Sequence, residues 1–216
     1  MTTTEPQTFT TVDTVEQLVE ILGEATGPVT AKERSALTGI DRDWLAATPF
    51  CVLATSDADG NCDASPKGDP AGALVHVIDD TTIAVAERPG NRRADGYRNI
   101  LSNPHVGLNF FIPGRGDTLR INGRARLVSD APFFDEMVVK GHRPVLALVV
   151  DIDTIFFHCA KAFLRSGLWK PETWDPEAIV PRRAVVAQQM ERRGTPLAEL
   201  DAYYDPDNYA GGLYTR

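Results

Sequence analysis

The hydrophobic positions of the chain follow two different periods. Across residues 12–22 apolar side chains recur every three or four positions, which predicts a short helix. Over 50–158 they alternate with polar residues or form short apolar runs between turn sequences, which predicts strands. Helical spacing returns at 182–193. The chain is therefore expected to fold as a β-domain between two helical segments.

About seven strands are predicted in the central part from eight candidate segments, and they are joined mostly by short turns. The candidate segments are 50–55, 62–67, 73–78, 82–86, 106–111, 118–128, 145–151 and 154–158. Regular short strands separated by Gly-, Pro- and Asp-rich turns are typical of an antiparallel barrel or sandwich rather than a parallel sheet. Two helices are expected to interrupt the strands, over 91–102 and 131–140.

These elements predict a mainly β (α+β) fold, an antiparallel β-barrel with helical N- and C-terminal arms. We divide the chain into an N-terminal helical arm (1–45), a barrel domain (46–170) and a C-terminal linker with a helical arm (171–216). Three prolines spaced five residues apart mark the linker. No part of the arms has enough apolar residues to suggest a second independent core.

Charge changes this picture because it is unevenly distributed. The 216 residues contain 22 basic and 30 acidic side chains, a net charge of −8 that argues against a general nucleic-acid binder. The segment from Arg88 to Arg126, however, holds eight arginines against Asp95 and Asp117, a net charge of +6. An arginine-dense segment in an acidic chain predicts a site for a small anion.

Other classes of protein are disfavoured by what the sequence lacks. Three irregularly spaced cysteines without CxxC, and four histidines without HExxH, favour neither a disulfide framework nor a metal site. The polar N-terminus does not resemble a signal peptide, and no apolar run is long enough to span a membrane. We expect a cytoplasmic protein that binds neither membrane nor nucleic acid.

The segment 87–95 combines the end of a predicted strand with the start of a helix. Asn91 is a good helix N-cap, and Arg92 and Arg93 would then fall in the first helical turn. Cations there oppose the helix dipole unless a bound phosphate lies between them and the helix N–H groups. The alternative is that these arginines are solvated or paired with Glu87 and Asp95. Neither GxGxxG nor GxxxxGK[ST] occurs.

Two further segments carry candidate ligand groups. In the polar strand 62–67, Lys67 could reach an anion and Ser65 could offer a hydroxyl, whereas Pro66 marks an edge or a bulge. The alternative is a protected edge strand. In 158–169, a lysine, an arginine and a tryptophan at helical offsets could line a pocket together, although such a tryptophan more often belongs to a core or an interface.

Four motifs and their order resemble the pyridoxamine 5′-phosphate oxidase-like FMN-binding split-barrel family, and within it a bacterial subgroup of FMN-dependent proteins. The motifs are SPKGD at 65–69, RPGNRR at 88–93, LRINGRA at 119–125 and HCAKAFLRSGLW at 158–169. The resemblance extends over about 44–174. It implies an antiparallel split barrel and a homodimer that holds FMN in two symmetric clefts at the subunit interface.

The resemblance also implies which residues bind the cofactor. Those expected to contact the flavin ring and ribityl chain are Asp63, Ser65, Pro66 and Lys67, with Glu87 and Arg88 near the ribityl chain and phosphate. Those expected to hold the phosphate are Asn91, Arg92 and Arg93. Thr118 and Arg120 would line the cleft from the other subunit, and Lys161, Arg165 and Trp169 match the family's C-terminal cofactor-side motif.

The expected activity is hydride or electron transfer between FMN and a small organic substrate. Pyridoxamine phosphate oxidases end in a Trp-Arg-Leu type motif that closes over the vitamin substrate, whereas this sequence ends in GGLYTR. The substrate is therefore left open, and no catalytic residue is assigned. A non-enzymatic flavin carrier or sensor is one alternative, and a deazaflavin- or haem-binding protein on the same barrel is another.

Overall fold

A computed structural model describes residues 8–25, 27, 31–175 and 181–214. The chain forms two compact units, 1–33 and 34–216. In the first unit α1 (Val15–Leu22) begins at a capping box, in which Thr14 Oγ1 accepts a hydrogen bond from Gln17 N at 3.2 Å. The apolar residues of α1 are largely exposed.

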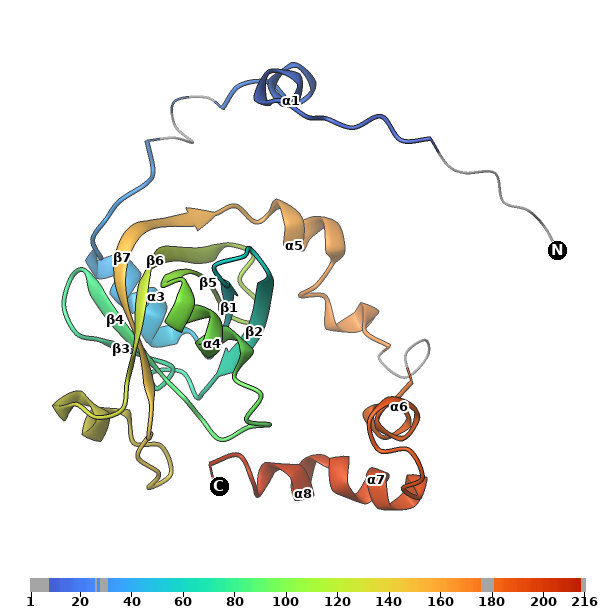
Figure 1. Cartoon of the computed structure of the whole chain (residues 1–216). Coiled ribbons are helices and arrows are strands. Elements are labelled where there is room, and N and C mark those ends of the chain that lie inside the picture. The colour runs from blue at the N-terminus through green and yellow to red at the C-terminus, as the bar shows by residue number, and fades with distance from the viewer. Residues whose placement is uncertain (1–7, 26, 28–30, 176–180, 215–216) are drawn as a thin grey trace. The chain divides into compact units, whose positions relative to one another are not determined.

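The second unit is built on one seven-stranded antiparallel sheet in the order β2-β1-β5-β6-β7-β4-β3 (Figure 1). The strands are β1 (Phe50–Ser56), β2 (Cys62–Gly68), β3 (Val75–Val77), β4 (Thr82–Ala86), β5 (His105–Phe111), β6 (Thr118–Val128) and β7 (Ala147–His158). Because β2 and β3 do not pair with each other, the barrel is split. The predicted fold class is confirmed.

One strand replaces two predicted ones. The segments 145–151 and 154–158 belong to a single β7, because β7 stays paired with β6 along its length and only shifts register opposite Asn122 and Gly123. A Cβ on Gly123 would lie 2.0 Å from the carbonyl oxygen of Asp151, so only glycine allows the two backbones to approach this closely.

The core lies on the inner face of the curved sheet. Alternate side chains such as Leu53, Phe110 and Ile155 are fully buried there, as the period of two requires. α3 (Gly39–Ala47) adds Trp44 and Leu45 to this core. α4 (Asp95–Ser102) packs on β1, β2 and β6 through its buried face.

Asp41 anchors α3 to the barrel. Its buried carboxylate accepts hydrogen bonds from Arg34 Nη2 at 2.9 Å and from Thr38 N at 2.7 Å, while Arg34 exchanges backbone hydrogen bonds with Ile155 of β7. Burial alone would raise the pKa of Asp41, but the bonds from Arg34 and Thr38 outweigh burial and lower it.

The remaining helices are short: α5 (Lys161–Ser166), α6 (Arg183–Met190), α7 (Leu197–Tyr204) and α8 (Pro206–Ala210). α6 and α7 share a small core of Ala184, Ala187 and Leu200. The helix predicted over 131–140 is a single 3-10 helix, Pro132–Met137, and a second lies at Pro171–Thr173. Among the described residues, no helix is long and apolar enough to cross a membrane.

The Gly123 contact gives a first prediction. Gly123→Ala would drive a methyl group into the Asp151 carbonyl, so we expect the free energy of unfolding to fall by about 3 kcal/mol. Gly39→Ala is the matched control, because a Cβ there meets no atom within 4 Å. Urea denaturation of both variants measures the difference. Equal stability of the two variants would contradict the close approach of β6 and β7.

Candidate functional site

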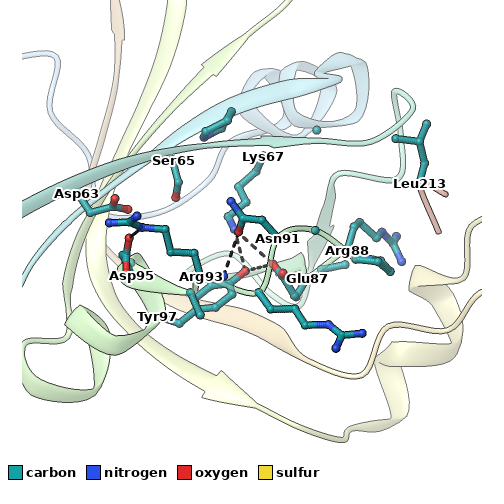
Figure 2. Close-up of a pocket in the computed structure, with 18 of the residues that line it drawn as sticks. Asp63, Ser65, Lys67, Glu87, Arg88, Asn91, Arg93, Asp95, Tyr97 and Leu213 are labelled. Atoms are coloured by element: carbon teal, nitrogen blue, oxygen red, sulfur yellow. Dashed lines mark hydrogen bonds and ion pairs between the residues drawn. The ribbon is translucent and has the colours of Figure 1, made fainter. Parts of the chain in front are cut away.

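A pocket of about 570 Å³ lies between β2, the end of β4 and the segment that leads into α4 (Figure 2). Nine of the fourteen predicted site residues line it: Asp63, Ser65, Pro66, Lys67, Glu87, Arg88, Asn91, Arg92 and Arg93. Its volume is in the range of ordinary cofactor sites. The structure therefore brings the strand motif and the arginine motif together in one concave site.

Three ionisable side chains from three different elements meet at the base of this pocket. Lys67 Nζ donates hydrogen bonds to the hydroxyl oxygen of Tyr97 at 3.0 Å and to Glu87 Oε2 at 3.3 Å. The Tyr97 hydroxyl donates to the same Glu87 oxygen. The ammonium group also lies 4.5 Å from the centre of the Tyr97 ring. We call Lys67, Glu87 and Tyr97 the pocket triad.

The environment of the triad fixes the protonation of Tyr97. Burial raises the pKa of Tyr97, and the hydrogen bond to Glu87 raises it further, so Tyr97 keeps its proton. The side chains of Lys67 and Glu87 are only 17% and 25% exposed, so their mutual attraction is screened less than that of a surface pair. The triad thus places a charged ammonium donor at a defined position in the pocket.

The helix in the arginine motif starts later than predicted. α4 begins at Asp95, not at Asn91, and Arg92 and Arg93 lie before its first turn. The reason is backbone conformation, because Arg92 (φ 60°) and the N-cap residue Ala94 (φ 57°) are left-handed, which interrupts a helical path. The prediction of Asn91 as the N-cap is therefore wrong, and Asn91 Oδ1 instead accepts a hydrogen bond from Arg93 N at 3.0 Å.

This backbone geometry is suited to an anion. Left-handed residues next to right-handed ones turn successive N–H groups towards one side, and such concave arrangements bind anions. The first N–H groups of α4 follow directly and carry the positive end of the helix dipole. Non-glycine residues in left-handed conformations cost energy, and they tend to persist where function requires them.

The three arginines of the motif differ in their partners. Arg88 Nε donates to Asp69 at 2.6 Å and Arg88 Nη2 to the Met137 carbonyl at 2.9 Å, so this arginine is held within the fold. Arg93 pairs with Asp95, but its side chain is 77% exposed. Arg92 is exposed and forms no hydrogen bond or ion pair with any described residue. Of the motif, Arg92 and Arg93 are thus available to an anion, and Arg88 is not.

The other end of the pocket presents unused acceptors. Asp63 Oδ2 is buried and has no hydrogen-bond partner among the described residues. A Cβ on Gly96 would lie 3.1 Å from this oxygen and 3.6 Å from Ser65 Oγ, so the glycine leaves both groups room. A buried carboxylate oxygen without a donor is costly, so Asp63 Oδ2 is a candidate acceptor for a water or a ligand in this pocket.

Five predicted residues do not line this pocket. Thr118 is buried on β6, and the Arg120 guanidinium lies 4.2 Å from the centre of the Phe156 ring. Lys161 and Arg165 are exposed on α5, and Trp169 follows it. Trp169 Nε1 donates to the Arg115 carbonyl at 2.6 Å, and its ring stacks on Phe163.

The structure adds residues that the sequence did not reveal. Tyr97 could have been suspected from its place in the first turn of α4, beside the arginines. Leu213 and Tyr214 line the pocket, yet they lie far along the chain from the other lining residues. Tyr214 donates its hydroxyl hydrogen to Asp69 at 2.9 Å, a contact between residues 145 positions apart that no local pattern predicts.

The model of the family described as pyridoxamine 5′-phosphate oxidase matches residues 39–159, more than half of the chain and all strands of the barrel. The chain belongs to the pyridoxamine 5′-phosphate oxidase family. No curated protein matches the sequence significantly. The family match agrees with the resemblance expected from the motifs.

Solved structures with a similar barrel share little sequence with this member of the pyridoxamine 5′-phosphate oxidase family. HupZ from Group A Streptococcus has 19% identity over 56% of this chain and 93% of its own, with a TM-score of 0.45. General stress protein 26 from Bacillus anthracis has 17% identity over 54% and 88%, with a TM-score of 0.41. A FAD-binding protein from Mesorhizobium loti has 16% identity over 58% and 94%, with a TM-score of 0.39. We draw no functional conclusion from these three.

The pocket triad gives a second prediction. Tyr97→Phe removes one hydrogen-bond partner from both Lys67 and Glu87, so we expect the free energy of unfolding to fall by about 1–2 kcal/mol. Tyr203→Phe is the control, because Tyr203 is 46% exposed. Urea denaturation compares the two. A Tyr97→Phe variant as stable as the control would show that the triad is not formed.

Proposed function

We propose that this protein is an FMN-dependent oxidoreductase that binds the cofactor in the pocket between β2, β4 and α4 and acts on a small organic molecule. One observation carries this proposal. Arg92 and Arg93, whose side chains are available to a ligand, belong to the left-handed turn that lines the pocket before α4. We place its activity in the cytoplasm, as the sequence led us to expect.

The arginine motif fits a phosphate group. Arg92 has no competing carboxylate, and the exposed pair of Arg93 with Asp95 contributes little, so a phosphate can replace Asp95 as its partner. Asn91 stabilises the turn through its bond to Arg93 N. Arg88, held by Asp69, would keep the β4 end of the pocket in place rather than bind the phosphate.

The other walls fit the polar parts of a flavin. Asp63 Oδ2 can accept a hydrogen bond from a ribityl hydroxyl or a ring N–H, and Ser65 Oγ lies beside it. Lys67, held by the rest of the triad, can donate to a ring carbonyl. The pocket thus offers hydrogen-bond acceptors near Asp63 and a donor at Lys67, which suits a ligand that carries both donors and acceptors.

When bound, FMN supplies the hydride or electron transfer. The side chains of this protein would do the rest. Arg92 and Arg93 bind the phosphate, and Lys67 stabilises negative charge on the ligand. Glu87 and Tyr97 hold the Lys67 ammonium in place through their hydrogen bonds.

The phosphate role is tested by comparing FMN with riboflavin, which lacks the phosphate. Wild-type protein should bind FMN much more tightly than riboflavin. Arg92→Ala with Arg93→Ala should weaken FMN binding about 100-fold and leave riboflavin binding nearly unchanged, because two charge-assisted contacts are lost. Quenching of flavin fluorescence measures both affinities.

The matched control is Arg98→Ala with Arg193→Ala, two exposed arginines that do not line the pocket. It should bind both flavins as the wild type does. Equal FMN affinity in the Arg92/Arg93 variant and the control would refute the phosphate role of the motif. Failure of the wild type to bind either flavin would refute the proposed function itself.

We also propose that the functional form is a homodimer, as the resemblance implies. Support comes from β5 and β6, where Asn109 Oδ1 and Arg120 Nε are buried without a hydrogen-bond partner among the described residues. Asn109 and Arg120 are directly paired across β5 and β6. They lie on the same sheet face as Phe50 of β1, whose side chain is 39% exposed. A second copy packed on this face would cover Phe50 and place Thr118 and Arg120 near its cleft.

The dimer is tested by sedimentation equilibrium. Wild-type protein should sediment at twice the chain mass of 23.6 kDa. Phe50→Asp should shift the equilibrium towards the monomer, since it places a charge on the proposed interface. Leu101→Asp, on an exposed position of α4, is the control and should remain dimeric. A monomeric wild type would be incompatible with the proposal.

A further inference from the structure

The contacts of Tyr214 suggest a role for the Leu213–Tyr214 segment. Asp69, at the end of β2, is buried and uses its two carboxylate oxygens for two different partners. Oδ2 accepts from Arg88 at 2.6 Å, and Oδ1 accepts from the Tyr214 hydroxyl at 2.9 Å. Burial, followed by this hydrogen bond, raises the pKa of Tyr214, so the hydroxyl remains a donor. A buried carboxylate thus connects Tyr214 to the wall of the pocket.

The Tyr214 ring is also held from its sides. The guanidinium carbon of Arg88 lies 5.8 Å from the ring centre and Lys140 Nζ lies 5.5 Å from it. The His142 ring stacks on Tyr214 with an angle of 16° between the ring planes. Two cations, one imidazole and one carboxylate therefore fix the ring in one place, although Tyr214 is only half-buried.

Tyr214 stands between two cavities. It lines the main pocket and also a second cavity of about 370 Å³, formed by residues on both sides of the turn that precedes β7. The two cavities also share Glu87, Arg88 and Pro89 of the segment after β4. Figure 2 shows Leu213 at the Arg88 end of the main pocket. Tyr214 is therefore placed where the two cavities adjoin.

The second cavity offers groups that suit a nucleotide. His142 presents an aromatic ring, and Arg143 presents a guanidinium group whose pairs with Asp130 and Asp135 are at the surface. Both of those carboxylates are 77% exposed, so a phosphate could displace them at little cost. Guanidinium groups recognise phosphates and stack on aromatic bases.

We infer that Tyr214 determines the size of the ligand that the pocket accepts. Held on Asp69, its ring limits the binding space to a flavin mononucleotide and excludes the additional nucleotide of a flavin dinucleotide. Without the ring, the second cavity joins the main pocket and can receive that nucleotide. The inference rests on the proposed flavin function and adds a specificity-determining residue to it.

The test compares the affinities for FMN and FAD. Apo-protein is titrated with each flavin, and fluorescence quenching gives the ratio of the two dissociation constants. The wild type should prefer FMN by at least about tenfold, and Tyr214→Ala should reduce this preference at least about tenfold, mainly by a gain in FAD affinity. Tyr214→Phe keeps the ring but loses the bond to Asp69, so its ratio should lie between the two.

Two comparisons keep the result interpretable. Tyr203→Ala removes a more exposed tyrosine from α7, which lines neither cavity, and should keep the wild-type ratio. Melting temperatures of all variants confirm that they are folded. A wild-type ratio in Tyr214→Ala, or a wild type that binds FAD as well as FMN, overturns the inference while leaving the flavin function intact. Absence of binding of either flavin to the wild type overturns both.

Discussion

Charge pairing within the pocket is the constraint on which the site depends. The pocket contains four cationic side chains, and three of them already have a carboxylate: Lys67 pairs with Glu87, Arg88 with Asp69 and Arg93 with Asp95. The buried pairs stabilise the architecture, because breaking either would leave an uncompensated buried charge. The exposed pair and the unpaired Arg92 remain for a ligand. Only part of the arginine-rich charge is therefore available for binding.

The ends of the strands and of α4 determine which charged side chains are buried in pairs and which remain available to a ligand. β2 is the edge strand of the sheet, so Asp63, Ser65 and Lys67 face the pocket from a strand with one free side. β4 is completely buried up to Ala86, and the chain then leaves the sheet at Glu87. The left-handed residues Arg92 and Ala94 delay the start of α4 to Asp95, and both line the same pocket. Strand edge, strand end and helix start converge because the barrel is split rather than closed.

Local patterns were sufficient to predict the barrel, and only the family resemblance assigned β2 and the arginine segment to one site. Alternating apolar and polar residues, with turn residues between them, identified the β-segments. The resemblance that the motifs carry placed β2 and the arginine segment at one cofactor site. Local patterns were not sufficient for backbone details that depend on packing. The start of α4 depends on the conformations of Arg92 and Ala94, and the continuity of β7 depends on its pairing with β6. The pairing of β7 is with a strand that is distant in sequence, and the left-handed residues before α4 have no local signature that predicts them.

Side-chain contacts between residues distant in sequence could not be predicted either. Asp69 is the last residue of the SPKGD motif, but its partners, Arg88 and Tyr214, are 19 and 145 positions away in the sequence. The three members of the pocket triad come from β2, the end of β4 and α4, so the role of Tyr97 becomes visible only in three dimensions. Lys161 and Arg165, which both their helical offsets and the resemblance assigned, lie on α5 outside this pocket. Their contribution depends on the proposed second copy.

The central claim is that this pocket holds FMN, and the cofactor that accompanies the purified protein tests it most directly. A visible spectrum of the protein, followed by release and mass determination of the bound molecule, distinguishes the candidates. The account predicts flavin absorption bands and the mass of FMN, in an amount close to one molecule per chain. A deazaflavin or haem spectrum, or a protein that neither contains FMN nor takes it up on reconstitution, would contradict it.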